Sequence, residues 1–210
     1  MSNVLNSFVA TAVGFNPKEW KYHVIVDFSS SMLKPIRPGY SRANQAKELA
    51  FGLLGELNSI GVPSIELYRF NNGAVTHVPE VSDAEQLGNA LVARVVGGTP
   101  LDLALSTAFD VSRGSDQKDA FIILLDGQPD SRAETERVII NYVNTLQSAE
   151  DALILPVQIG DEPDAYEWLK TDLDENLRAK FDVIYTVTSK EFGDYPSLLA
   201  MFAHALAQSK

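Results

Sequence analysis

The most constraining stretch of the sequence is a short apolar run that ends in one carboxylate and three hydroxyl groups, Val24-Ile25-Val26-Asp27-Phe28-Ser29-Ser30-Ser31. Three consecutive β-branched residues predict a strand that is covered on both faces, as in a parallel sheet. Asp27 then stands at the carboxyl end of this strand, the edge where open α/β sheets bind ligands. Alternate residues of an extended loop point the same way, so Asp27, Ser29 and Ser31 are expected to face one place. Such oxygens suit Mg²⁺.

Two later stretches bring further oxygen ligands to the end of a strand or into a loop. One is Gly97-Gly98-Thr99-Pro100-Leu101-Asp102, and the other is Phe121-Ile122-Ile123-Leu124-Leu125-Asp126-Gly127. Asp126 follows five apolar residues, where an ionised carboxylate is costly unless a cation or hydrogen-bond donors compensate it. Together with Asp27-x-Ser29-x-Ser31, the two stretches resemble the metal-ion-dependent adhesion site of von Willebrand factor type A (vWA) domains.

The resemblance implies an α/β fold with a doubly wound, mostly parallel six-stranded sheet, one antiparallel edge strand and helices on both faces. It also implies a metal site made of Asp27, Ser29, Ser31, Thr99 and Asp126. These residues would hold Mg²⁺, or Mn²⁺ in its place, and leave one coordination position open for a Glu or Asp carboxylate of a partner protein. Two carboxylates and one divalent cation would leave the loaded site close to neutral.

A loop separates the serines from the helix that follows them. Residues 32–40 contain two prolines and one glycine, which predicts irregular structure before a helix over 41–59. This insertion resembles the intracellular, bacterial or phage branch of the family that is associated with tellurium resistance. The sub-family resemblance implies a role in a cytoplasmic complex.

Several nearby residues have a structural interpretation beside a functional one. Thr99 could cap a helix that has Pro100 at its first position, and could do so while its hydroxyl also faces a cation. Asp102 is interpreted as an acid of the first helical turn. Asp130 and Ser131 are interpreted as capping residues of the next helix. The alternation points Ser30 away from the metal, and the three histidines are expected to be structural: His23, His77 and His204.

Hydrophobic periodicity divides the chain into one domain with a short N-terminal extension. Residues 1–20 predict a helical extension that packs on the domain or, alternatively, binds a partner. Residues 21–210 predict one further domain, which the resemblance implies is a single vWA domain, with a β-hairpin over 65–78 built around Asn71-Asn72-Gly73. Further strands are expected over 119–126, 153–159 and 183–187, and further helices over 83–94, 101–111, 131–148, 164–179 and 195–208.

Composition excludes several function classes. The chain of 210 residues has no cysteine, which rules out disulfides and thiolate metal sites. Its formal net charge is −11 and it has no basic cluster, so we expect no nucleic-acid partner. No apolar run reaches the roughly 20 residues that cross a bilayer, and no signal peptide is recognised. We therefore expect a cytoplasmic protein without membrane insertion; the sequence sets no oligomeric state.

The alternatives to a binding module are an enzyme and a structural domain with a vacant site. A metal-dependent phosphatase with Asp27 as nucleophile needs a second acid two residues later, where this chain has Ser29. Ser31 as a nucleophile lacks a Gly-x-Ser-x-Gly elbow and a paired histidine. Neither glycine-rich nucleotide-binding motif occurs. The sequence therefore favours a protein that is not an enzyme.

Overall fold

The computed structural model describes residues 15–114, 116–188, 191 and 194–208. Most of the predicted N-terminal helix falls on residues 1–14, outside the described residues. Phe15 is buried against Trp20 and Phe202, with ring centroids 6.1 and 5.1 Å away. Within the described ranges, no helix is long and apolar enough to cross a membrane.

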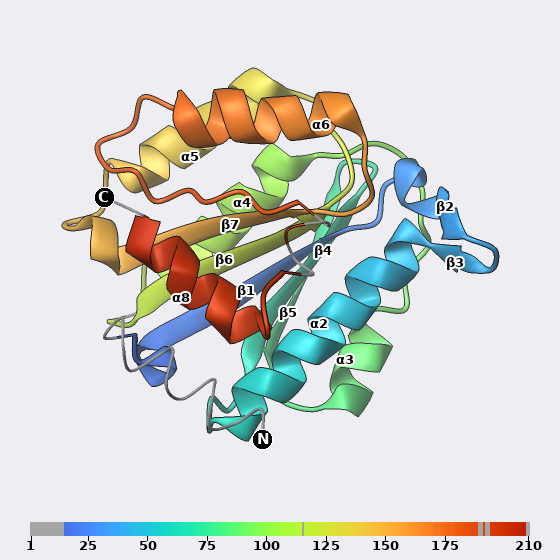
Figure 1. Ribbon diagram of the computed structural model, residues 1–210, viewed down its shortest axis with the longest axis horizontal. Coiled ribbons are helices and arrows are strands. Elements are labelled where there is room, and N and C mark those ends of the chain that lie inside the picture. Colours follow the sequence, from blue (N-terminus) through green and yellow to red (C-terminus); the bar gives the residue numbers. More distant parts are fainter. Residues whose placement is uncertain (1–14, 115, 189–190, 192–193, 209–210) are drawn as a thin grey trace.

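Five strands form the main sheet, in the order β5-β4-β1-β6-β7 (Figure 1). Neighbouring strands are parallel except β4 and β5, which form the predicted antiparallel hairpin at one edge. The strands are β1 (Trp20–Asp27), β4 (Ile65–Asn71), β5 (Ala74–Val81), β6 (Lys118–Leu125) and β7 (Ala152–Gln158). The predicted doubly wound α/β architecture is confirmed.

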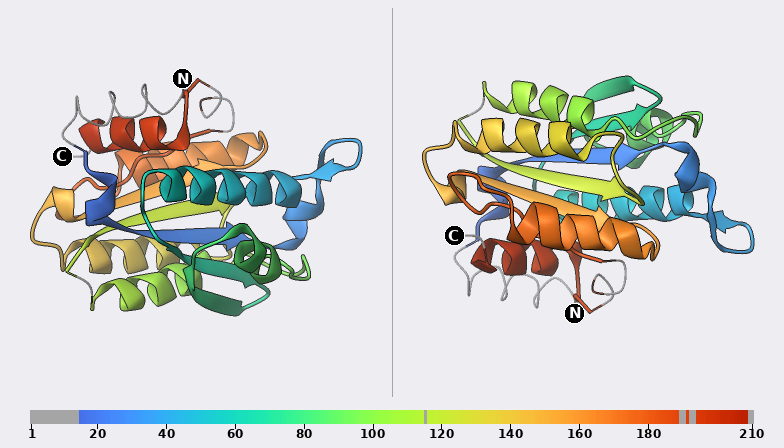
Figure 2. Two further views of the ribbon diagram at one scale, coloured as in Figure 1. Left: turned by 90° about the horizontal axis from the view of Figure 1, so that it is seen from below. Right: turned by 90° about the horizontal axis from the view of Figure 1, so that it is seen from above.

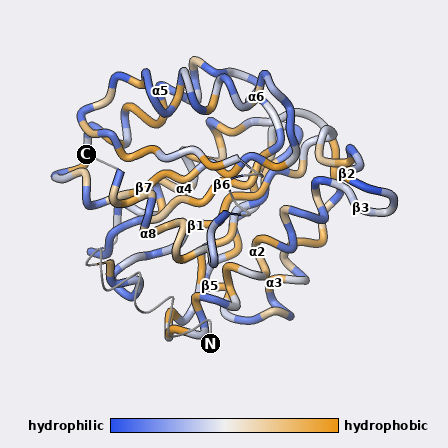
Figure 3. The backbone as a smooth tube through the Cα atoms, viewed as in Figure 1, coloured by the Kyte–Doolittle hydropathy of each residue, from blue (hydrophilic) through white to orange (hydrophobic). Residues whose placement is uncertain are grey.

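Helices cover both faces of the sheet (Figure 2). Val24 and Val26 of β1 pack with α2, α3 and α8 on one face, and Ile25 packs with α4, α5 and η4 on the other. The apolar residues follow the strands and the inward sides of these helices (Figure 3). The helical segments are α2 (Arg42–Ser59), α3 (Ala84–Ala90), α4 (Leu101–Ser112), α5 (Arg132–Val143), α6 (Pro163–Glu167), the π-helical η4 (Trp168–Glu175), α8 (Leu198–Gln208) and the 3₁₀ turns η1 (Pro17–Glu19), η2 (Ser30–Leu33) and η3 (Ala149–Asp151).

The prediction of a six-stranded sheet is wrong. Residues 183–187 touch β7 only through two isolated parallel bridges, Ile154 with Ile184 and Val157 with Val187. The amides of Ile154 and Gln158 donate to Val183 and Val187, at 2.8 Å each. The donor between them would come from residue 156, which is a proline and has no N–H group. The ladder is therefore interrupted at its centre.

Other segments also differ from the sequence prediction, among them the helix expected over 164–179, which is divided into α6 and the π-helical η4 and ends at Glu175. The expected loop 32–40 contains a short antiparallel hairpin, β2 (Pro35–Arg37) and β3 (Tyr40–Ser41), which projects beside the carboxyl end of the sheet (Figure 1). The helices expected over 83–94 and 131–148 are shorter, as α3 and α5. The boundaries of α2 agree with the prediction because Ser41 caps it through the Asn44 amide.

Candidate metal centre

The central strand places Asp27 at the carboxyl edge of the sheet. Asp27 is the last residue of β1, and Asp126 directly follows β6, the neighbouring strand. The register pairs Val26 with Leu124, so the two carboxylates reach the same edge. After β1 the chain continues to β4 on one side, and later returns to β6 on the other side. Ligands bind at such a switch point in open α/β sheets.

Four of the five predicted ligands form one chain of hydrogen bonds. The Ser29 amide donates to Oδ1 of Asp27 at 2.6 Å. The hydroxyls of Ser29 and Ser31 are 3.0 Å apart, and Ser31 donates to Oδ1 of Asp126 at 2.7 Å. The expected oxygens therefore lie together, although the chain reaches Ser31 through the 3₁₀ turn η2 and not through the extended loop that was expected.

Backbone contacts attach the loop of Thr99 to the serine loop. The Ser30 amide donates to the Gly97 carbonyl at 3.0 Å, and the Gly97 amide donates to the Ser30 hydroxyl at 2.8 Å. Ser30 thus binds the glycine loop, in agreement with its expected direction. Thr99 is buried, and the interpretation of Thr99 as a helix cap is wrong, because α4 has Pro100 at its N-cap without a side-chain hydrogen bond.

Asp130 belongs to the site, which corrects its interpretation as a capping residue. Its Oδ1 accepts from the Thr99 amide at 2.9 Å, and its own amide donates to the Thr99 carbonyl at 2.9 Å. A Cβ at Gly98 would lie 2.6 Å from the Asp130 carboxylate oxygens, so this close approach requires glycine. Ser131 does cap α5, through the Glu134 amide.

The remaining oxygen of Asp27 lacks any compensation. Among the described residues, Oδ2 of Asp27 and Oε1 of Gln45 are buried side-chain polar atoms without a hydrogen-bond partner. Burial raises the pKa of Asp27 to about 7 despite the hydrogen bonds from Ser29, and the charges of Asp126 and Asp130 raise it further. A buried carboxylate of this kind takes up a proton or a cation.

The donor set fits a small, hard cation. Hydroxyl and carboxylate oxygens are the ligands that Mg²⁺ prefers. In the part of the chain that the structure describes, no three His, Cys, Asp or Glu side chains form a metal-binding group. The predicted set does not need a third acid, because three of its five members, Ser29, Ser31 and Thr99, would bind through hydroxyls.

Sequence reasoning missed Arg42. Its side chain is buried, and Nη1 donates to Oδ2 of Asp126 at 2.9 Å while Nη2 donates to Oε1 of Glu162 at 2.9 Å. Burial works against its charge, but the two acids more than offset this, and the Arg42 pKa is raised. Asp130 adds a third carboxylate and Arg42 adds a positive charge, so the two offset each other and a site loaded with a divalent cation would stay close to neutral. The available signal was a cation in the first turn of a helix, which the helix dipole disfavours without an acidic partner.

The histidines lie away from this centre and make structural contacts. His23 is buried between Asp119, at 2.9 Å from Nε2, and the Tyr68 hydroxyl, at 3.1 Å from Nδ1. His77 lies 2.6 Å from Glu66. His204 packs against two tyrosine rings.

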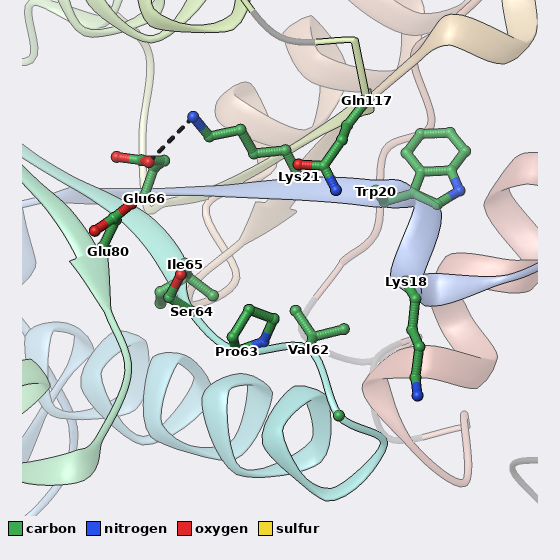
Figure 4. Close-up of a pocket in the computed structure, with 11 residues that line it drawn as sticks. Lys18, Trp20, Lys21, Val62, Pro63, Ser64, Ile65, Glu66, Glu80 and Gln117 are labelled. Carbon is green, nitrogen blue, oxygen red and sulfur yellow. Dashed lines mark ion pairs between the residues drawn. The ribbon is translucent and has the colours of Figure 1, made fainter.

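A hollow of about 290 Å³ lies at the opposite end of the strands (Figure 4). It is lined by the starts of β1 and β4, and Lys21 pairs across it with Glu66 at 3.1 Å. The hollow and the candidate metal centre therefore use opposite edges of one sheet.

Solved structures share this architecture. The SpRpn10 VWA domain matches with a TM-score of 0.59 and 11% identity, over 80% of this chain and 86% of that one. The chain has the fold of a vWA domain. The manganese-loaded Plasmodium vivax TRAP protein matches with a TM-score of 0.54 and 13% identity, over 83% of this chain and 70% of that one. No family model and no curated protein sequence matches the chain.

A further vWA neighbour is the ArnB paralog VWA2 from Sulfolobus acidocaldarius. It matches with a TM-score of 0.50 and 19% identity, over 87% of this chain. The chain spans 44% of that protein's length. Identities this low concern the fold alone, so the site is argued from the residues of this chain.

Proposed function

We propose that this vWA-fold chain is a metal-dependent protein-binding module. Asp27, Ser29, Ser31, Thr99 and Asp126 hold Mg²⁺, or Mn²⁺ in its place, and a partner protein contributes a Glu or Asp carboxylate. The observation that carries the proposal is the buried, unpartnered Oδ2 of Asp27 beside the hydrogen-bonded chain of Ser29, Ser31 and Asp126.

The site contains residues that would hold the ion and one residue, Arg42, that adjusts the charge around it. The bound ion supplies a Lewis-acidic position that accepts a carboxylate oxygen. The Ser29 amide donates to Oδ1 of Asp27, and Ser31 and Arg42 donate to the two oxygens of Asp126, so both acids are already positioned. The Arg42 charge offsets one of the site's carboxylates, which lowers the repulsion that an anionic partner group would otherwise meet.

The surface beside the centre suits a protein partner. The β2–β3 hairpin exposes Ile36, and the preceding turn exposes Leu33. Arg37 lies 4.4 Å from the centroid of the Tyr40 ring. We assign the module to a bacterial or phage cytoplasmic complex of the tellurium-resistance-associated type, on the basis of this insertion, the acidity of the chain and its lack of cysteine.

Metal titration of matched threonine variants tests the proposal. Mn²⁺ binding is measured by calorimetry for the wild type, Thr99→Ala and the control Thr107→Ala. Thr107 donates to the Leu103 carbonyl within α4, so its removal deletes a hydroxyl outside the centre. We expect Thr99→Ala to lose about tenfold or more in affinity, by analogy with the loss of other metal-site groups, and Thr107→Ala to match the wild type.

A screen for phosphatase, nucleotidase and esterase turnover accompanies the titration. We expect no turnover with or without the metal. Metal-dependent turnover that Asp27→Ala abolishes would overturn the assignment as a binding module. Equal Mn²⁺ affinity of Thr99→Ala and Thr107→Ala would remove Thr99 from the ligand set.

A further inference from the structure

Three charged side chains from separate elements meet next to the candidate metal centre. Oε1 of Glu162 lies 2.9 Å from Nη2 of Arg42 and 2.6 Å from Nζ of Lys34. Arg42 begins α2, Lys34 precedes the β2–β3 hairpin, and Glu162 precedes α6. One carboxylate thus connects two cations, and Arg42 connects it in turn to Asp126.

The two cations and the acid differ in how firmly they are held. The Arg42 side chain is 8% exposed, and its other nitrogen is engaged by Asp126. A Cβ at Gly160 would lie 2.7 Å from Nε of Arg42, so the backbone packs directly on the guanidinium group. The Glu162 side chain is 38% exposed. Arg42 is therefore a fixed part of the site, and Glu162 is the member that another carboxylate can replace.

We propose that Arg42 and Lys34 form a second carboxylate subsite beside the metal, which Glu162 fills until a partner carboxylate displaces it. The inference rests on the proposed function and extends it to the partner, whose binding segment carries two acidic side chains. One acid reaches the metal and the other replaces Glu162. Arg42 suits this role, because its planar guanidinium group can bind Asp126 and a second carboxylate at the same time.

The two carboxylate positions are close enough for one short segment. Asp126 bonds to Ser31 through Oδ1 and to Arg42 through Oδ2. The subsite is therefore separated from the metal ligands by the width of one carboxylate and one guanidinium group. In an extended segment, the Cα atoms of residues i and i+2 are about 7 Å apart. Acidic side chains at these two positions can therefore reach the metal and the subsite at the same time.

Short peptides on the Mn²⁺-loaded protein provide the test. The probes are Ac-Gly-Glu-Gly-Glu-Gly-NH₂ and the two peptides in which either glutamate is replaced by glutamine. Binding is read from water-proton relaxation, which falls when a carboxylate displaces water from Mn²⁺. The proteins are the wild type, Glu162→Gln and the control Asp161→Asn, which removes the same charge from the same loop.

We expect Glu162→Gln to increase the preference for the di-acidic peptide over the mono-acidic peptides by about fivefold or more, because it frees the subsite for a charge-assisted contact. Asp161→Asn should leave this ratio within about twofold of the wild type, because a general change in surface charge affects all of the peptides. Adding Lys34→Gln to Glu162→Gln should remove most of the gain. Melting curves of each protein establish that the variants are folded.

The outcomes separate this inference from the proposed function. Equal ratios in Glu162→Gln and the wild type, with all three peptides bound, would overturn the second subsite and leave the metal-dependent module standing. Equal gains in Glu162→Gln and Asp161→Asn would do the same. Mn²⁺ binding with no response to any peptide would overturn both.

Discussion

The buried Oδ2 of Asp27 makes the stability of the metal-free protein depend on pH. The pKa of Asp27 in the folded protein is raised to about 7, above its value in the unfolded chain, so the folded state binds the extra proton. The metal-free fold is therefore most stable, with respect to this group, at acidic pH. It loses that stability as the pH rises through 7, because the carboxylate must then ionise without a cation.

Asp27→Asn should remove this loss. We expect the variant in chelator to exceed the wild type in unfolding free energy at pH 8 by on the order of 2–4 kcal/mol, and by much less at pH 5. Urea denaturation at both pH values measures the difference. Asp102→Asn, which changes an acid in the first turn of α4, is the control. Equal stabilities of wild type and Asp27→Asn at pH 8 would contradict the prediction.

Glu66 should show the opposite pH dependence. Burial opposes its ionisation, but hydrogen bonds from His77 and Lys21 outweigh this, and its pKa is lowered. Its contribution to stability is therefore present above its unfolded pKa, and is lost as the pH falls through the folded value. Glu66→Gln should cost about 1–2 kcal/mol at pH 7 and less near pH 3, as measured by urea denaturation. Glu80 lines the same hollow but is exposed, so Glu80→Gln should lower the unfolding free energy little. If both variants lost the same unfolding free energy, the ion pairs of Glu66 would contribute nothing specific.

At the level of single residues, local sequence patterns predicted side-chain direction but not long-range partners. Asp27, Ser29 and Ser31 converge as predicted, but the extended backbone on which that prediction rested ends at Ser30, where the 3₁₀ turn η2 begins. The contact of Arg42 with Asp126 spans 84 positions and that of Asp130 with Thr99 spans 31. Such contacts depend on how elements are arranged in space, which local spacing does not contain.

The interrupted ladder beside β7 gives a prediction at the scale of an element. Pro156→Val supplies the missing N–H group, so residues 183–187 should pair continuously with β7. Backbone amides in this segment should exchange with solvent about tenfold more slowly, since exchange requires opening of the ladder. The total free energy of unfolding should change by less than about 1.5 kcal/mol, because the new hydrogen bond is offset by the greater freedom of the unfolded chain.

Pro79→Val on the other edge strand, β5, is the matched control and should leave exchange in residues 183–187 unchanged. Unchanged exchange in Pro156→Val itself would show that another constraint interrupts the pairing. Thr186 offers one, because its amide binds Asp174 at 2.8 Å and its hydroxyl binds the Leu169 carbonyl at 3.1 Å.

Elements with strong local signals were predicted well, and those that depend on tertiary contacts were not. The β4–β5 hairpin has a clear turn sequence, and α2 has a capping serine and a continuous apolar stripe. Residues 183–187 have the composition of a strand, but whether they pair depends on the proline in β7. The short hairpin in 32–40 escaped prediction because its prolines and glycine favour a loop when only local sequence is considered.

The whole molecule should be stabilised by the cation in proportion to its occupancy. A ligand that binds only the folded state at 100 times its dissociation constant adds about 2.7 kcal/mol, or roughly 5–10 °C in melting temperature for a domain of this size. Mg²⁺ and Mn²⁺ should reach this value at lower concentration than Ca²⁺, since three hydroxyls and two carboxylates suit a compact octahedral ion.

Differential scanning calorimetry over a series of cation concentrations measures this effect. Asp27→Asn serves as the control, and its melting temperature should not respond to Mg²⁺. A larger shift with Ca²⁺ than with Mg²⁺ would contradict the predicted geometry of the site. An equal shift in Asp27→Asn would indicate that the cations act at other acidic surfaces.

The pairing of β1 with β6 places the proposed metal binding late in the folding of the chain. Asp27 and Asp126 are almost one hundred positions apart in the sequence, and they come together only when β1 and β6 have paired in register. Contacts between such distant positions form slowly, because a long loop must close first. A chain still on the ribosome that has not yet exposed β6 lacks Asp126, so the proposed cation should bind only after β6 has joined the sheet.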